Sequence, residues 1–65
     1  MKVQSSTISE INHDGKLLTI TFVNGREYVY EGVSTKVYED FTNSESKGKF
    51  FHENINGRYN FSRVK

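Results

Sequence analysis

The chain contains no cysteine, no proline and no tryptophan among its 65 residues. Without cysteine there is neither a disulfide framework nor a thiolate metal site, so we expect a reducing, cytoplasmic compartment. No apolar run approaches the length that spans a bilayer, and the first residues lack the apolar core of a signal peptide. We therefore expect neither secretion nor contact with a membrane.

A chain of this length is enough for one small domain, and we expect residues 1–65 to fold as a single unit. So small a domain buries only about 60% of the surface that its unfolded chain exposes. Its stability is therefore expected to be low. A buried active-site cavity would remove core that the domain needs, and this favours a binding module that acts through its surface.

Two dipeptides typical of tight turns, Asp14-Gly15 and Asn24-Gly25, separate segments with strand-like sequences. Both dipeptides suit the type I′ turn, whose two central residues need positive φ. The pattern predicts a three-stranded antiparallel meander. Its strands are expected within residues 6–13, 16–23 and 26–31.

The predicted turns also determine which side chains share a face of the sheet. Two-residue turns place Ile20 opposite Val29 and Ile11 opposite Leu18. The expected core face carries Ile11, Leu18, Ile20, Phe22 and Val29. The expected second face, which is amphipathic, carries Ile8, Thr19, Thr21, Tyr28 and Tyr30. Ile8 and Ile11 are three residues apart, so they share a face only if the strand contains a β-bulge.

After Gly32 the spacing of apolar residues changes to that of a helix. Ser34 is expected to cap a helix of about two turns. The packed side of this helix is predicted to carry Val37, Tyr38 and Phe41.

A second helix is expected from a cap at Ser44 to about Ile55, ended by Gly57. Its packed face is predicted to carry Gly48, Phe51, His52 and Ile55. Gly48 disfavours a helix, so we expect it to lie close to another element. Residues 58–65 would form a short edge strand or an extended arm, and the whole is of the α+β class.

Three segments, residues 5–8, 25–30 and 44–59, carry a recognisable family pattern. The most specific part is the Ser-Lys-Gly-Lys-Phe-Phe run at 46–51. Together they resemble the KTSC family, a small domain found at the C-terminus of some lysyl-tRNA synthetases and as a stand-alone protein in bacteria and phages. The chain departs from that pattern at Ser34 and Asn60, where proline is usual. The resemblance implies the fold and carries no assigned activity.

Patterns that would carry catalysis or bind a metal are missing. The two histidines, His13 and His52, support neither a Ser-His-Asp arrangement nor a metal-binding spacing. We expect His13 to be solvated at a strand end and His52 to be half-buried on the second helix. Lys47-Gly48-Lys49 lacks the earlier glycine and the following Ser or Thr of a phosphate loop. The chain is therefore predicted to be no enzyme and to hold no metal and no cofactor.

Charge is distributed unevenly along the chain. Residues 1–46 carry four basic and seven acidic side chains, a net −3, whereas residues 47–65 carry five basic and one acidic, a net +4. A basic C-terminal third points weakly to a polyanionic partner. The predicted site for RNA or another single-stranded nucleic acid consists of Lys47, Lys49, Phe50, Arg58 and Arg63.

In this hypothesis the basic groups contact phosphates and Phe50 stacks on an unpaired base. A purely structural interpretation stays open. In it, the C-terminal tail covers Phe50, and the lysines are solvated or pair with Glu39, Asp40 and Glu45.

The alternative function is a protein-interaction module. Tyr28 and Tyr30, on the predicted amphipathic face, or an open edge strand would carry it. In the other interpretation that stays open, the tyrosines form an aromatic patch packed beneath the C-terminal tail. The nearby Glu10, Glu27 and Glu31 would repel phosphate from a base-stacking sheet face.

Overall fold

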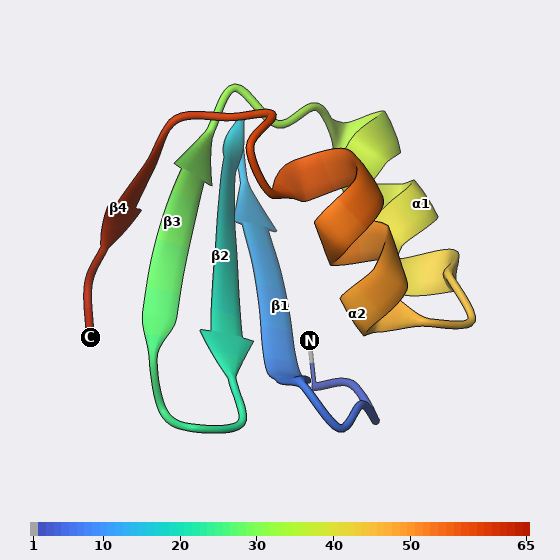
Figure 1. Ribbon diagram of the computed structural model, residues 1–65. Helices are drawn as coiled ribbons and strands as arrows, with labels where there is room; N and C mark the ends of the chain where they lie inside the picture. Colours follow the sequence, from blue (N-terminus) through green and yellow to red (C-terminus); the bar gives the residue numbers. More distant parts are fainter. Residues whose placement is uncertain (1) are drawn as a thin grey trace.

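A four-stranded antiparallel sheet carries the helices on one of its faces (Figure 1). The computed structural model describes residues 2–65, and the strands lie in the order β1-β2-β3-β4. They are β1 (Ile8–Asp14), β2 (Leu17–Phe22), β3 (Glu27–Glu31) and β4 (Phe61–Arg63). The helices are α1 (Thr35–Asn43) and α2 (Lys47–Phe50), and α2 continues directly into a π-helix, η1 (Phe51–Ile55). The predicted α+β class is confirmed, and the tail forms the fourth strand, at the edge of the sheet.

The first hairpin turns one residue later than predicted. Asp14 pairs with Leu17, so the two loop residues are Gly15 and Lys16. Gly15 has a φ of 64° and no residue other than glycine has positive φ within the described chain, a combination that fits type II′ rather than type I′. Ile11 consequently lies opposite Ile20 instead of Leu18. This shift in register is an even number of residues, so the side chains of β2, and those of β1 from Glu10 onward, keep their predicted faces.

The second hairpin has a three-residue loop where two residues were predicted. The Phe22 amide donates to the Arg26 carbonyl (2.8 Å), and Gly25, the last loop residue, has a φ of 90°. This geometry matches the common three-residue hairpin loop, a type I turn followed by one residue with a left-handed backbone conformation. Ile20 therefore lies opposite Tyr28, and not opposite Val29 as predicted.

A shift of one residue moves every side chain of a strand to the other face. Tyr28 and Tyr30 therefore lie on the helix-bearing face, and Val29 lies on the outer face. The prediction for this strand was wrong, and Tyr30 is 4% exposed in the core.

A β-bulge in β1 brings Ile8 into the core. The pairing of β1 with β2 is irregular between Ile8 and Glu10, which adds one residue to β1. Ile8 and Ile11 are both fully buried as a result. The placement of Ile8 on the second face was therefore wrong, and the bulge is what lets Ile8 and Ile11 share the core face.

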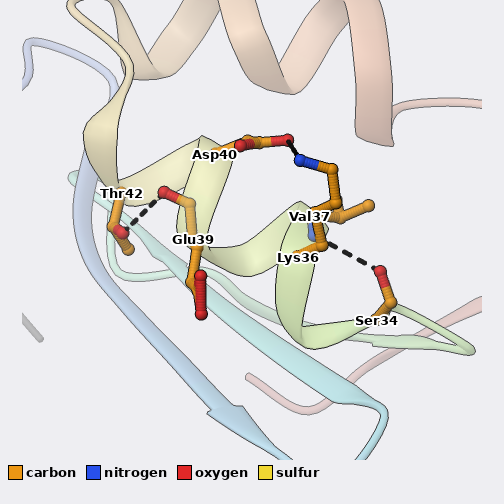
Figure 2. Close-up of polar contacts among 6 residues, drawn as sticks. All are labelled: Ser34, Lys36, Val37, Glu39, Asp40 and Thr42. Carbon is orange, nitrogen blue, oxygen red and sulfur yellow. Dashed lines mark hydrogen bonds and ion pairs between the residues drawn. The ribbon is translucent and has the colours of Figure 1, made fainter.

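Helix α1 begins and packs as its sequence predicts. The Ser34 hydroxyl accepts from the Val37 amide (3.3 Å), as Figure 2 shows. On the solvent side, Lys36 pairs with Asp40 at 3.7 Å. Phe41, on the opposite side, is fully buried.

The second helix starts two residues later than predicted. Its N-cap is Ser46, whose hydroxyl accepts from the Lys49 amide, while Ser44 caps the C-terminal end of α1. The Asn56 amide donates to the Phe51 carbonyl (2.8 Å), an i to i+5 bond that makes the last part a π-helix. The predicted end at Ile55 is confirmed, and Gly57 follows with a φ of 78°.

The core lies between the helices and the first three strands. A Cβ atom on Gly48 would lie 3.5 Å from the Thr7 hydroxyl, so α2 does contact the segment before β1, at an ordinary van der Waals distance. The buried side chains are Ile8, Ile11, Leu18, Ile20, Tyr30, Val33, Phe41 and Ile55.

Candidate nucleic-acid interface

Helix α2 supplies the first three residues of the predicted interface. Lys47 donates from its ammonium group to the Ser44 carbonyl, which ties it to the loop between the helices. Phe50 packs against the core, and its ring stacks on Phe41 with centroids 5.1 Å apart and planes 12° apart. One face of the Phe50 ring is therefore occupied, which limits Phe50 as a platform for a base.

A shallow hollow of about 280 Å³ lies beside Phe50 and Lys49. It is lined by Ser44, Glu45, Ser46, Lys49, Phe50 and Glu53. Two carboxylates thus share the hollow with one ammonium group, and this local charge does not favour a phosphate. Lys47 and Lys49 form no ion pair with another side chain of residues 2–65, so the predicted pairing with Glu39, Asp40 or Glu45 is not observed.

Arg58 and Arg63 lie apart from the α2 residues. Arg58 is exposed in the turn after η1, where its amide donates to the Ile55 carbonyl (3.0 Å). Arg63 is exposed on β4, which Figure 1 shows at the edge of the sheet farthest from the helices. The structure therefore divides the predicted interface into a helix group and a β4 group.

The β4 group adjoins a cluster of aromatic rings, which we call the aromatic cluster. The ring centroids of Phe22 and Phe51 are 5.4 Å apart. Phe22 also contacts Tyr28, and Phe51 contacts Tyr30. Phe61 of β4 contacts both tyrosines, with centroid distances of 5.5 Å to Tyr30 and 5.7 Å to Tyr28. The members of the cluster are Phe22, Tyr28, Tyr30, Phe51 and Phe61.

Phe61 is the functional candidate that the sequence did not reveal. It is 56% exposed, whereas Tyr30 beside it is buried. The alternation of Tyr59, Phe61 and Arg63 in the tail was a usable signal, because it predicts that Phe61 and Arg63 share one face of a strand. The tyrosines do pack with the tail through Phe61, but the tail lies beside them in the sheet, and they are on the helix-bearing face instead of the predicted second face.

Tyr30 has little surface to offer a partner. Burial raises the pKa of its hydroxyl above the usual 10.0, and the nearby Tyr28 adds to the effect. Tyr28 is only half-buried, so of the two residues predicted for protein binding it is the accessible one.

Charges are sorted across the sheet. Strand pairing puts Glu10, Thr21 and Glu27 on one face, and the same face receives Asp14 and Glu31. This outer face bears no helix. The helix-bearing face of the four strands carries Arg63 and no carboxylate. The strand carboxylates, all on the outer face, are Glu10, Asp14, Glu27 and Glu31.

The histidines exchange their predicted environments. His13 is half-buried, bonded through Nε2 to the Val33 carbonyl (2.7 Å) and stacked on Tyr38 at 5.0 Å, instead of being solvated. His52 is exposed and touches Phe51 edge-on, instead of being half-buried. Both predictions were wrong: His13 lies on the same face as Ile11 and packs against Tyr38 of α1, and His52 is exposed on η1. Within residues 2–65, no three His, Asp or Glu side chains are grouped as a metal site would require, and no helix is long and apolar enough to cross a membrane.

Comparison with known proteins identifies the domain. The family model of the KTSC domain matches residues 4–59. The chain belongs to the KTSC family. It is 35% identical to a lysine–tRNA ligase of Nostoc punctiforme and 32% identical to one of Trichormus variabilis, in each case over 98% of this chain. The chain spans only 12% of the length of these two relatives.

A solved structure shares the fold over the whole chain. The crystal structure of a KTSC domain protein from Yersinia pestis superimposes with a TM-score of 0.93 at 32% identity, covering 100% of this chain and 94% of that one. The resemblance inferred from the three sequence segments is thereby confirmed.

Proposed function

We propose that this KTSC domain is a non-enzymatic module that associates with RNA through its helix-bearing side. The observation that carries the proposal is the 35% identity to part of a lysine–tRNA ligase, a protein whose name gives tRNA as its substrate. A small domain within such a protein has RNA in its surroundings. An accessory contact with that RNA is the simplest use for so small a domain.

The distribution of charge supports this side of the domain. An RNA backbone is attracted by Lys and Arg and repelled by carboxylates. The outer face of the sheet carries four carboxylates, whereas the helix-bearing face of the strands carries Arg63 opposite Tyr28 of the aromatic cluster. Arg58 is exposed in the turn that precedes β4. The hollow next to Lys49 is less suited, because Glu45 and Glu53 line it. We therefore assign Arg58 and Arg63 a larger part than Lys47 and Lys49.

The test is the salt dependence of binding to a labelled single-stranded RNA, followed by fluorescence anisotropy. Each phosphate contact contributes about 0.7 to the slope of log K against log salt for single strands. The Arg58→Glu/Arg63→Glu variant should weaken binding and lower that slope by about 1.4. The Lys47→Glu/Lys49→Glu variant should have a smaller effect.

The matched control reverses two charges at the hairpin loops. Lys16→Glu/Arg26→Glu makes the same change in net charge at exposed residues of the β1–β2 and β2–β3 connections. If this control weakens binding as much as the arginine variant does, net charge alone attracts the RNA and no interface exists. If wild-type protein binds no RNA at low salt, the proposed function is wrong.

The second candidate is a protein-interaction module, which the exposed edge strand favours. Every residue of β4 is exposed, and its outer edge has no neighbouring strand among residues 2–65. Such edges accept a further strand from a partner. A pull-down with Tyr28→Ala, which alters the half-buried tyrosine next to β4, tests this candidate: unchanged capture of a partner would exclude the Tyr28 face.

A further inference from the structure

Phe61 is unusual among the exposed apolar residues of the domain. The large hydrophobic side chains with the most exposure in residues 2–65 are Leu17, Val23, Phe61 and Val64, and Phe61 is the aromatic one. Its exposure of 56% does not come from a loose chain end, because Phe61 is part of β4 and pairs with Tyr30. A ring held by a strand and open to solvent is a suitable platform for another flat ring.

The aromatic cluster holds this ring on one side only. Phe61 meets Tyr30 at 5.5 Å with planes 34° apart, and Tyr28 at 5.7 Å with planes 82° apart. These contacts fix the orientation of Phe61 before any ligand arrives, so little conformational entropy is lost on binding. The surface of Phe61 away from the two tyrosines stays accessible.

Arg63 places a positive charge two residues after Phe61, on the same face of β4. Arg63 lies directly opposite Tyr28, and Phe61 lies opposite Tyr30, so both project from the helix-bearing side. Two residues of a strand are about 6.6 Å apart. The Nε of Arg63 donates to the Lys65 carbonyl (2.8 Å), and its guanidinium has further N–H donors for a phosphate. The carboxylates of β3, Glu27 and Glu31, project from the opposite face.

We propose that Phe61, Tyr28 and Arg63 form a stacking site for an unpaired nucleobase and its adjoining phosphate. This inference rests on the proposed RNA association and specifies the class of RNA. A base inside a duplex has both faces covered by its neighbours, whereas the bases of a single strand are free to stack on a side chain. The site discriminates unpaired from paired RNA, and it does so through Phe61 rather than Phe50.

The experiment compares a labelled single-stranded oligoribonucleotide with the same sequence in a blunt duplex. Replacing a stacking aromatic by alanine weakens binding by about 5- to 150-fold in other proteins. We expect Phe61→Ala to lower affinity for the single strand within this range and to leave duplex affinity nearly unchanged. Phe61→Tyr, which retains a flat ring, should bind like the wild type. Leu17→Ala, at a 46% exposed residue of the outer face, is the matched control and should have no effect.

A second measurement does not depend on the stability of the alanine variant. The chain has no tryptophan, so Phe61→Trp introduces a single tryptophan at the site, which is excited at wavelengths where the four tyrosines do not absorb. Its emission should be quenched by the single strand and much less by the duplex. Equal affinity of wild-type and Phe61→Ala protein for the single strand, or no quenching while anisotropy reports binding, would overturn the stacking site and leave the proposed function standing. No binding of wild-type protein to either RNA would overturn both.

Discussion

The register of β3 leads to a prediction that separates two neighbouring residues. Tyr30 is 4% exposed and contacts Phe51 and Phe61, whereas Val29 is half-exposed on the outer face. Replacing a large buried aromatic residue by alanine destabilises a protein by about 3–5 kcal/mol. Val29→Ala removes two partly buried carbon groups, an effect of about 1 kcal/mol or less. A register shifted by one residue would reverse this order.

These effects are large compared with the stability of the domain. At about 0.05–0.15 kcal/mol per residue, a chain of this length has a free energy of unfolding of about 3–10 kcal/mol. Tyr30→Ala should therefore unfold much of the population at room temperature. In urea, with an m value of about 1 kcal/mol/M, its midpoint should fall by about 3–5 M and that of Val29→Ala by about 1 M or less.

Circular dichroism in urea measures both midpoints. Tyr30→Leu, which fills part of the volume, is the variant to use if Tyr30→Ala proves too unstable for a baseline, and it should still lose more stability than Val29→Ala. A larger loss for Val29→Ala than for either Tyr30 variant would refute the observed register and, with it, the placement of the aromatic cluster.

Three further predictions concern caps, glycines and pH. Ser34→Ala should cost about 1 kcal/mol, read from the thermal midpoint, because its hydroxyl accepts from the first turn of α1; no change would mean that water replaces the cap. Gly25→Ala should destabilise the domain by about 1 kcal/mol or more, because Gly25 has a φ of 90° that alanine disfavours. Gly48→Ala should stabilise it by about 0.5–1 kcal/mol, because alanine favours a helix and its Cβ would meet Thr7 at an ordinary distance. Equal effects of the two variants in urea would contradict these backbone assignments. Burial raises the pKa of Tyr30, so the stability contributed by its neutral hydroxyl is present below pH 10 and is lost as pH rises through the raised pKa. Tyr30→Phe should lessen this loss of stability in thermal melts between pH 9 and 11.

The helices were easier to predict than the pairing of the strands. The cap at Ser34, the packed side of α1 and the end of η1 at Ile55 follow from local sequence, because capping and helical periodicity act over a few residues. Hairpin register depends on loop length, which Asn24-Gly25 leaves open between two and three residues. One additional loop residue moved Tyr28 and Tyr30 to the opposite face.

The site was predicted less well than the fold. The basic residues of the C-terminal third are exposed or half-buried, as solvated charges must be. Which of them lie together depends on tertiary structure: the α2 lysines lie with the helices, whereas Arg63 lies on β4 at the opposite edge of the sheet (Figure 1). Phe50 was taken as the exposed ring because an ideal helix turns it away from Phe51. Phe50 stacks on Phe41 instead, and Phe61 on β4 is the exposed ring.

An amide-resolved NMR titration with a short single-stranded RNA, at low and then at moderate salt, tests RNA association most directly. We predict shifts at Tyr28 and at residues 58–63 that weaken as salt rises, with the outer-face residues Thr19 and Val29 unaffected. The absence of shifts at low salt, or shifts confined to the outer face, would contradict the proposal that this domain contacts RNA through its helix-bearing side.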